Sequence, residues 1–128
     1  FYIKIHNYHW NVTGMDFHPT HKALEEMYDD MADLMDDVAE RVLQIGDKPY
    51  VTMKDMLAAA KIKEESATSF DSKTIIKAIL PEYEYFLNAF RELSDTANEA
   101  NDKATIALAD EKVANLEKAI WMLKAQLA

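Results

Sequence analysis

All four histidines of this 128-residue sequence lie within its first 21 residues, as two pairs with i,i+3 spacing. The pairs are His6/His9 and His18/His21. Imidazole binds first-row divalent metals such as iron, manganese and zinc, and the chain has no cysteine that could build a thiolate site. Histidines near helix ends are also commonly exposed or capping residues, so the clustering alone leaves both interpretations open.

Carboxylates continue this pattern further along the chain. Glu25 lies one helical turn after His21, and Asp36 and Glu40 form a second pair with i,i+4 spacing. Acidic residues at helical spacing usually form a solvated face. About 16 Å of helical rise separates Glu25 from Asp36, whereas metals lie only about 2.0–2.2 Å from their oxygen or nitrogen ligands. One helix therefore cannot close a single metal site from both pairs.

The elements that must position these residues are helices. Hydrophobic residues make up 49% of the sequence and recur every three or four positions, while only 2 glycines and 3 prolines are available for turns. We expect one domain of residues 1–128, with the end of a helix over residues 1–13 and a long helix over 17–45. A short helix over 52–60, a surface connection over 61–69, and two further long helices that meet at residues 101–102 should follow. Gly14 should end the first helix and Asp16 should cap the second.

This order of elements predicts the fold class. Four helices with a long link between the second and the third match a four-helix bundle of the crossover type, here with a short extra helix in the crossover. The sequence starts at Phe1 rather than Met and is helical from the outset, so we expect the N-terminal part of the first helix to be missing.

Antiparallel packing would bring the candidate ligands together. If the first two helices reverse about Met15, residues whose numbers sum to 30 face each other, which places His9 opposite His21. The third and fourth helices contain no histidine, so a di-iron site inside one bundle, with Glu-x-x-His on two helices, is not expected.

A second copy of the chain could complete the site. If two copies of the second helix cross antiparallel about a two-fold axis between residues 30 and 31, His21 faces Glu40 of the partner subunit. The same axis places Glu25 opposite Asp36 of the partner subunit. The spacing therefore predicts two equivalent histidine and carboxylate sites at a subunit interface, which suit Fe(II), Mn(II) or Zn(II).

Charge and hydropathy narrow the range of partners. The sequence has 23 acidic and 14 basic residues, a net charge of −9, which disfavours nucleic acid as a partner and favours cations. No apolar run approaches the ~20 residues that cross a membrane, so no membrane span is expected.

The two tryptophans allow more than one role. Trp10 follows His9, and Trp121 belongs to the last helix. Each is interpreted as a core or interface aromatic. For Trp10 the alternative is an electron donor close to a bound metal.

Three segments together carry a family resemblance. They read His6-Asn7-Tyr8-His9-Trp10-Asn11-Val12-x-Gly14, Phe17-x-x-x-His21 and Asp36-Asp37-x-Ala39-Glu40-Arg41-x-x-x-x-Gly46. With the closing Ile120-Trp121-Met122-Leu123, this pattern resembles the Dps family of mini-ferritins, a ferritin-like family, and particularly its neutrophil-activating-protein branch. The resemblance covers essentially the whole chain.

The resemblance implies a cytoplasmic iron-storage protein that serves iron homeostasis and protection from oxidative stress. Such a protein is a hollow dodecamer whose two-fold interfaces hold ferroxidase centres. There Fe(II) is oxidised to Fe(III), commonly by hydrogen peroxide, and the ferric mineral is stored inside.

Site residues follow from the resemblance, motif by motif. The implied iron ligands and catalytic residues are His9, His21 and Glu25 from one subunit, with Asp36 and Glu40 from its partner. Many members have Asp where this chain has Glu25, and His6 and His18 are not general ligands in the family. Acidic pores at three-fold axes near the start of the fourth helix would draw on Asp102 and Asp110.

Two other functions stay open at this point. One is a non-enzymatic helical assembly that protects DNA or acts on host cells, and the other is a bundle that buffers metal without turnover. Direct DNA binding in the family often relies on lysine-rich tails, and Lys124 is the only basic residue near the C-terminus. With a charge of −9 per chain, tight direct DNA binding is disfavoured.

Overall fold

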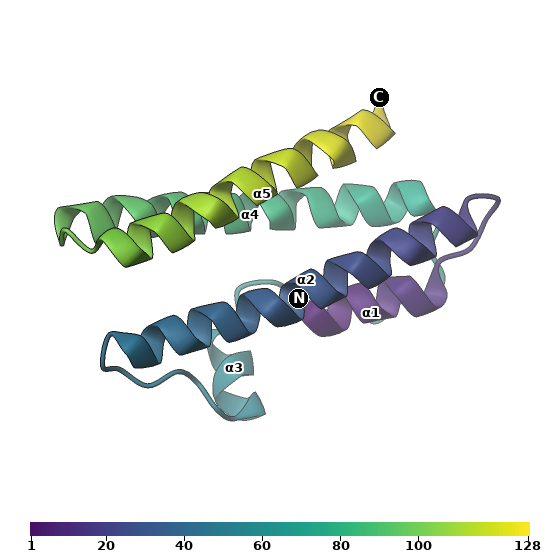
Figure 1. Ribbon diagram of the computed structural model, residues 1–128. Coiled ribbons are helices and arrows are strands. Elements are labelled where there is room, and N and C mark those ends of the chain that lie inside the picture. The colour runs from purple at the N-terminus through teal and green to yellow at the C-terminus, as the bar shows by residue number, and fades with distance from the viewer. The chain divides into compact units, whose positions relative to one another are not determined.

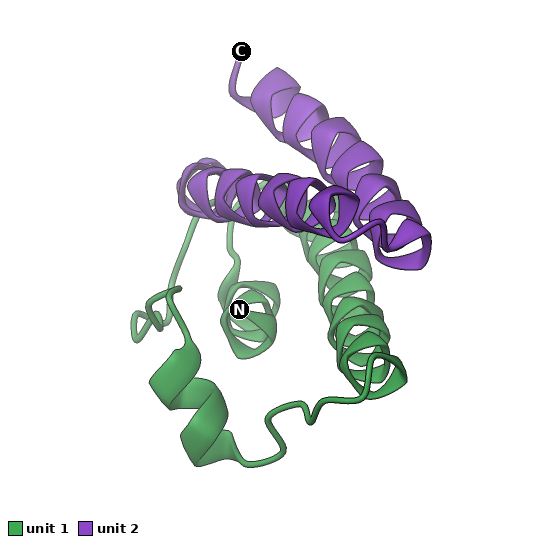
Figure 2. Cartoon of the chain, turned by 90° about the vertical axis from the view of Figure 1, so that its left-hand side faces the viewer, with its two compact units in different colours: residues 1–72 green, residues 73–128 purple.

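The computed structural model describes residues 1–128 as an all-helical chain with five helices (Figure 1). They are α1 (Tyr2–Asn11), α2 (Phe17–Gln44), α3 (Met53–Ala59), α4 (Ser72–Glu99) and α5 (Lys103–Leu127). The predicted helices, including the short one in the crossover, are confirmed. None of the five is long and apolar enough to span a bilayer. The chain divides into two compact units, residues 1–72 and 73–128 (Figure 2).

In the first unit, a glycine turn folds α1 back against α2. Gly14 has φ of +120°, a conformation that side chains with a Cβ rarely adopt, so glycine is required there. The predicted capping bond of Asp16 is wrong. Asp16 is the N-cap residue of α2, but its carboxylate accepts no helix N–H and instead accepts the hydroxyl hydrogen of Ser72. Ser72 lies 56 residues further along the chain, a distance over which local spacing carries no information.

The crossover segment is fastened to α1. The Asn7 carboxamide donates to the carbonyl oxygens of Glu65 at 2.9 Å and Ala67 at 3.0 Å. A parallel bridge joins Val12 to Phe70, and both side chains are buried. Residues 61–69 therefore form the expected irregular connection, and it runs along one side of α1 while α2 packs on another.

Helix α2 has fewer buried side chains than its apolar pattern suggests. Leu24 is 2% exposed, whereas Met35 is 56% exposed and Ile45 is 59% exposed. Met35 lies at the edge of the apolar stripe because it follows Leu34 by about 100° of helical rotation. Ile45 lies beyond the last helical residue, just before Gly46, whose φ of +90° ends the helix.

In the second unit, α4 and α5 form an antiparallel pair. Arg91 is paired with Glu117 at 2.7 Å, and Glu84 is paired with Lys124 at 2.9 Å, so rising positions on α4 meet falling positions on α5. The turn between them uses Asn101 at φ of +54°. The buried side chains on the two helices are Ile75, Ile76, Ile79, Tyr83, Leu87, Phe90, Ala97, Thr105, Ala109, Leu116, Ile120 and Leu123.

Candidate metal centre

His9 and His21 lie against each other, as the predicted register of the first two helices requires. Their ring centroids are 3.7 Å apart and their planes differ by 19°. His9 is only 8% exposed. The hairpin of α1 and α2 thus brings two imidazoles together where the two helices pack against each other.

Reciprocal hydrogen bonds fix the orientation of both rings. Nδ1 of His9 bonds to the main-chain oxygen of His21 at 2.8 Å, and Nδ1 of His21 bonds to the main-chain oxygen of His9 at 2.8 Å. A carbonyl oxygen can only accept, so each Nδ1 carries the hydrogen and donates it. In the neutral rings, Nε2 is then the unprotonated nitrogen on both side chains. This is the tautomer that a metal ligand needs, and a backbone carbonyl on the second ring nitrogen is the usual way of fixing it.

Aromatic side chains enclose the imidazole pair. Phe17 stacks on His21 with centroids 5.0 Å apart, and the ring of Tyr28 meets His9 edge-on at 5.2 Å. Tyr28 also stacks face to face with His6 at 3.9 Å. These contacts restrict both imidazoles to one orientation. Removal of the Tyr28 hydroxyl from water raises its pKa, and the negative charges of Glu25 and Asp29 raise it further.

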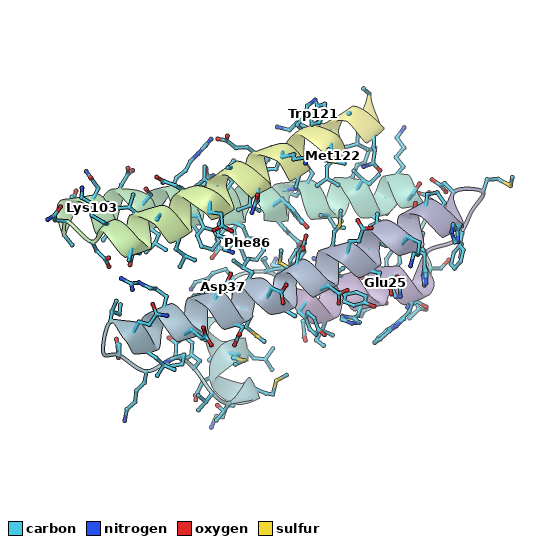
Figure 3. All side chains as sticks on the ribbon, viewed as in Figure 1. Glu25, Asp37, Phe86, Lys103, Trp121 and Met122 are labelled. Atoms are coloured by element: carbon cyan, nitrogen blue, oxygen red, sulfur yellow. The ribbon has the colours of Figure 1, made fainter.

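Glu25 lies one turn of α2 after His21, where α2 runs beside α1 (Figure 3). A hydrogen bond from Lys22 and the charge of that ammonium lower the pKa of Glu25, and His9 and His21 lower it further. Glu25 therefore stays ionised. Imidazole nitrogen and carboxylate oxygen are the ligand types that suit Fe(II), Mn(II) or Zn(II).

Asp36 and Glu40 lie on the same helix as Glu25, but further along it. Both are exposed, and no group of three or more histidine or acidic side chains within the chain is arranged to hold a metal ion. One chain therefore presents only part of a ligand set. That Asp36 and Glu40 reach the site of a partner subunit stays a prediction.

The remaining candidates have other roles or stay untested. The side chain of Asp102 caps α5 by accepting the N–H of Thr105 at 3.1 Å, and Asp110 accepts the hydroxyl hydrogen of Ser94 at 2.6 Å. Both acids thus make local bonds within the second unit, and their assignment to a pore stays a prediction.

Neither tryptophan is a core residue. Trp10 is 65% exposed and Trp121 is 66% exposed in the single chain, so of the two predicted roles the interface role stays a prediction. The ring of Trp10 meets His6 at 5.3 Å. Trp10 is adjacent to His9 in sequence, but neighbouring residues on a helix point about 100° apart, which directs the two side chains away from each other.

Two residues near the site were missed by the sequence reasoning. Tyr28 and Lys22 both contact candidate ligands, and both lie three residues from Glu25 on α2. Helical spacing alone could have placed them beside Glu25. It could not have shown that Tyr28 also reaches His9 and His6 on α1, because that contact depends on how the hairpin closes.

Comparison with known proteins defines the class. The model of the ferritin family, a ferritin-like domain, matches residues 1–128. A DNA protection during starvation protein of Helicobacter pylori is 49% identical over 127 residues, which are 99% of this chain and 88% of that protein.

Solved structures give the same result. The crystal structure of Helicobacter cinaedi CAIP matches with a TM-score of 0.98 and 65% identity over 99% of this chain and 89% of that one. A Vibrio cholerae Dps protein, described as a ferritin-like diiron-carboxylate protein, matches with a TM-score of 0.95 and 32% identity over 99% of this chain and 79% of that one. The chain therefore belongs to the Dps family of ferritin-like proteins, and the predicted ferritin-like fold is confirmed.

Proposed function

We propose that this chain is the subunit of an iron-storage and detoxification ferroxidase. It oxidises Fe(II) to Fe(III) at sites shared by two subunits, with hydrogen peroxide as the oxidant, and stores ferric mineral in a hollow dodecamer in the cytoplasm. The observation that carries the proposal is the His9/His21 pair, whose mutual main-chain bonds leave both Nε2 atoms unprotonated in the neutral rings.

Each subunit contributes a different part of the site. His9, His21 and Glu25 bind the substrate iron from one side. Asp36 of the partner subunit and Glu40 of the partner subunit complete the ligand set. Two Fe(II) ions release one electron each, and hydrogen peroxide takes up both electrons and two protons to form two water molecules. The protein holds the ligands in place and leaves a coordination position open for the oxidant.

Two further features support an assembly with iron as its substrate. The segment before and within α3 exposes large apolar side chains in the single chain, and such surface is commonly covered by other subunits. They are Tyr50 (64% exposed), Val51 (80%), Met53 (68%) and Leu57 (57%). The net charge of −9 per chain raises the local concentration of cations around an assembly.

This charge also bears on DNA. Repulsion from phosphate disfavours tight direct binding, so any protection of DNA is indirect and follows from the removal of Fe(II) and peroxide. A protein that only buffered metal would bind Fe(II) without consuming peroxide. Anaerobic loading with Fe(II), followed by addition of peroxide, separates these functions, because only the ferroxidase shows rapid peroxide loss together with a ferric core that stays in solution.

Complementation between two inactive variants tests whether the site is shared. His21→Ala and Asp36→Ala each remove one ligand from every site. In a mixed dimer, one of the two sites combines the intact His21 of one chain with the intact Asp36 of the other. Random co-assembly in equal amounts should therefore restore about one quarter of the wild-type sites. Both variants should keep wild-type helicity by circular dichroism.

The outcomes are distinct. Recovery of rapid iron oxidation on co-assembly supports the shared site. If the mixture is as inactive as its parents, the site does not span two subunits. If the single variants oxidise iron as fast as the wild type, the ferroxidase proposal is wrong.

A further inference from the structure

Glu25, a proposed ligand, already has a cation as its partner. Nζ of Lys22 donates to Oε2 of Glu25 at 2.8 Å, one turn of α2 away. The side chains are 58% and 39% exposed, so this is a surface ion pair. Such pairs contribute little to folding, and water can readily replace either partner. The interaction therefore needs no role in stability and can exchange when a stronger cation arrives.

The same carboxylate also feels the imidazole pair. Lys22 has the largest effect on the pKa of Glu25, and the charges of His9 and His21 act in the same direction. Glu25 is thus paired with one ammonium group and is also within electrostatic reach of the His9 and His21 rings. A divalent ion held by the Nε2 atoms of these rings and by Glu25 would take over the role that Lys22 has in the metal-free chain.

The competition has a definite sign. An ammonium group repels a divalent cation bound to the same carboxylate, and release of the carboxylate from the ammonium opposes metal binding. The long, flexible stem of lysine lets the ammonium turn away into solvent once the ion is bound. The repulsion and the loss of the ion pair both weaken metal binding as long as Lys22 is present.

We propose that Lys22 is an affinity-setting residue that competes with Fe(II) for Glu25. This inference rests on the proposed function, since it takes Glu25 as a ligand. In the metal-free assembly, Lys22 neutralises Glu25 and limits repulsion among the acidic side chains of α2. When iron binds, Lys22 is displaced. The site then holds iron loosely enough to pass Fe(III) on to the mineral.

The test measures binding of Co²⁺ to the metal-free, assembled protein, by calorimetry and by visible absorption. Lys22→Gln removes the charge and should tighten binding by about three- to tenfold. Lys22→Arg keeps the charge and should stay within about twofold of the wild type. Lys61→Gln, an exposed lysine of the crossover segment, removes an equal charge elsewhere and should leave the affinity unchanged.

A double-variant cycle shows whether Lys22 acts through Glu25. In a Glu25→Gln background there is no carboxylate to compete for, so Lys22→Gln should tighten Co²⁺ binding much less than it does in the wild type. In 1 M salt the effect of Lys22→Gln should also shrink, because the competition is electrostatic.

Three outcomes would overturn the proposal. Weaker Co²⁺ binding in Lys22→Gln would show that Lys22 orients Glu25 as a ligand rather than competing for it. Unchanged binding would show no competition. An equal effect in the Glu25→Gln background would show only a general charge effect. Failure of the proposed function is recognised separately, because the wild-type assembly would then bind no Co²⁺ that depends on His21.

Discussion

Helices α2 and α4 are both 28 residues long, but they bury very different numbers of side chains. In α4 seven residues are buried, from Ile75 to Ala97, whereas in α2 only Leu24 is. All four histidines and all five proposed ligands belong to the first unit, and none belongs to α4 or α5. The second unit is thus built around apolar burial. The first unit keeps polar groups accessible, at the cost of a smaller buried core.

The largest expected effect is on the rate of Fe(II) oxidation, which should depend on the first unit and not on the core of the second. His9→Ala or His21→Ala should slow peroxide-dependent oxidation of Fe(II) at least about 100-fold, because removal of a ligand costs no less than the loss of its outer-shell partner. Stopped-flow absorbance of the ferric product measures the rate. Ile79→Ala in α4 should leave the rate per folded subunit within about twofold. A comparable loss in Ile79→Ala would show that the two regions are not separable in function.

For the free energy of unfolding we expect the opposite, a large effect in α4 and a small one in α2. Ile79 is 0% exposed, so Ile79→Ala should lower the free energy of unfolding by about 2–5 kcal/mol. Chemical denaturation followed by circular dichroism measures the change. His18→Ala, a substitution of an exposed residue on α2, should change the free energy of unfolding by less than about 0.5 kcal/mol. Equal costs for the two variants would contradict the division of roles.

A smaller effect is expected where the crossover segment is fastened to α1. Asn7→Ala removes both bonds from its carboxamide to the carbonyl oxygens of Glu65 and Ala67. Loss of these bonds should cost about 1–3 kcal/mol and speed proteolysis between residues 61 and 69. Limited proteolysis with mass spectrometry locates the cleavage. Asn98→Ala, on the exposed surface of α4, serves as the control and should not alter the cleavage pattern.

The smallest effect concerns the wall of the site. Tyr28→Leu removes the aromatic contacts with His6 and His9, and should weaken Co²⁺ binding by about two- to tenfold. Tyr28→Phe keeps the ring and should bind within about twofold of the wild type. If Tyr28→Phe weakens Co²⁺ binding as much as Tyr28→Leu does, the hydroxyl rather than the ring matters, and Tyr28 does not act by positioning His9.

Spacing rules that use only neighbouring residues were sufficient to predict the helices and the contact between His9 and His21. The apolar period located α2, α4 and α5, while turn and capping residues located α1 and α3. The turn after α1 set the register that pairs His9 with His21. This contact was predictable because a tight turn leaves only one way to align two short helical stretches. The mutual bonds from Nδ1 to the main chain were not, since ring rotation depends on the closed hairpin.

Other features depended on distant parts of the chain. The bond from Ser72 to Asp16 and the bridge between Val12 and Phe70 join residues more than 50 positions apart. No pattern near Asp16 distinguishes this partner from a helix N–H. The predicted ligand set could not be tested within one chain, because Asp36 and Glu40 are exposed and are proposed to act at a partner subunit.

Each imidazole donates to the main-chain oxygen of the other histidine, so both ring orientations depend on the packing of α1 against α2. If α1 swings away from α2, both rings lose the carbonyl that fixes their tautomer, and the nitrogen donors disperse together. A bound ion that uses both Nε2 atoms would therefore stabilise the packing of α1 against α2. By mass action it would raise the resistance of this half of the subunit to unfolding as the metal concentration increases.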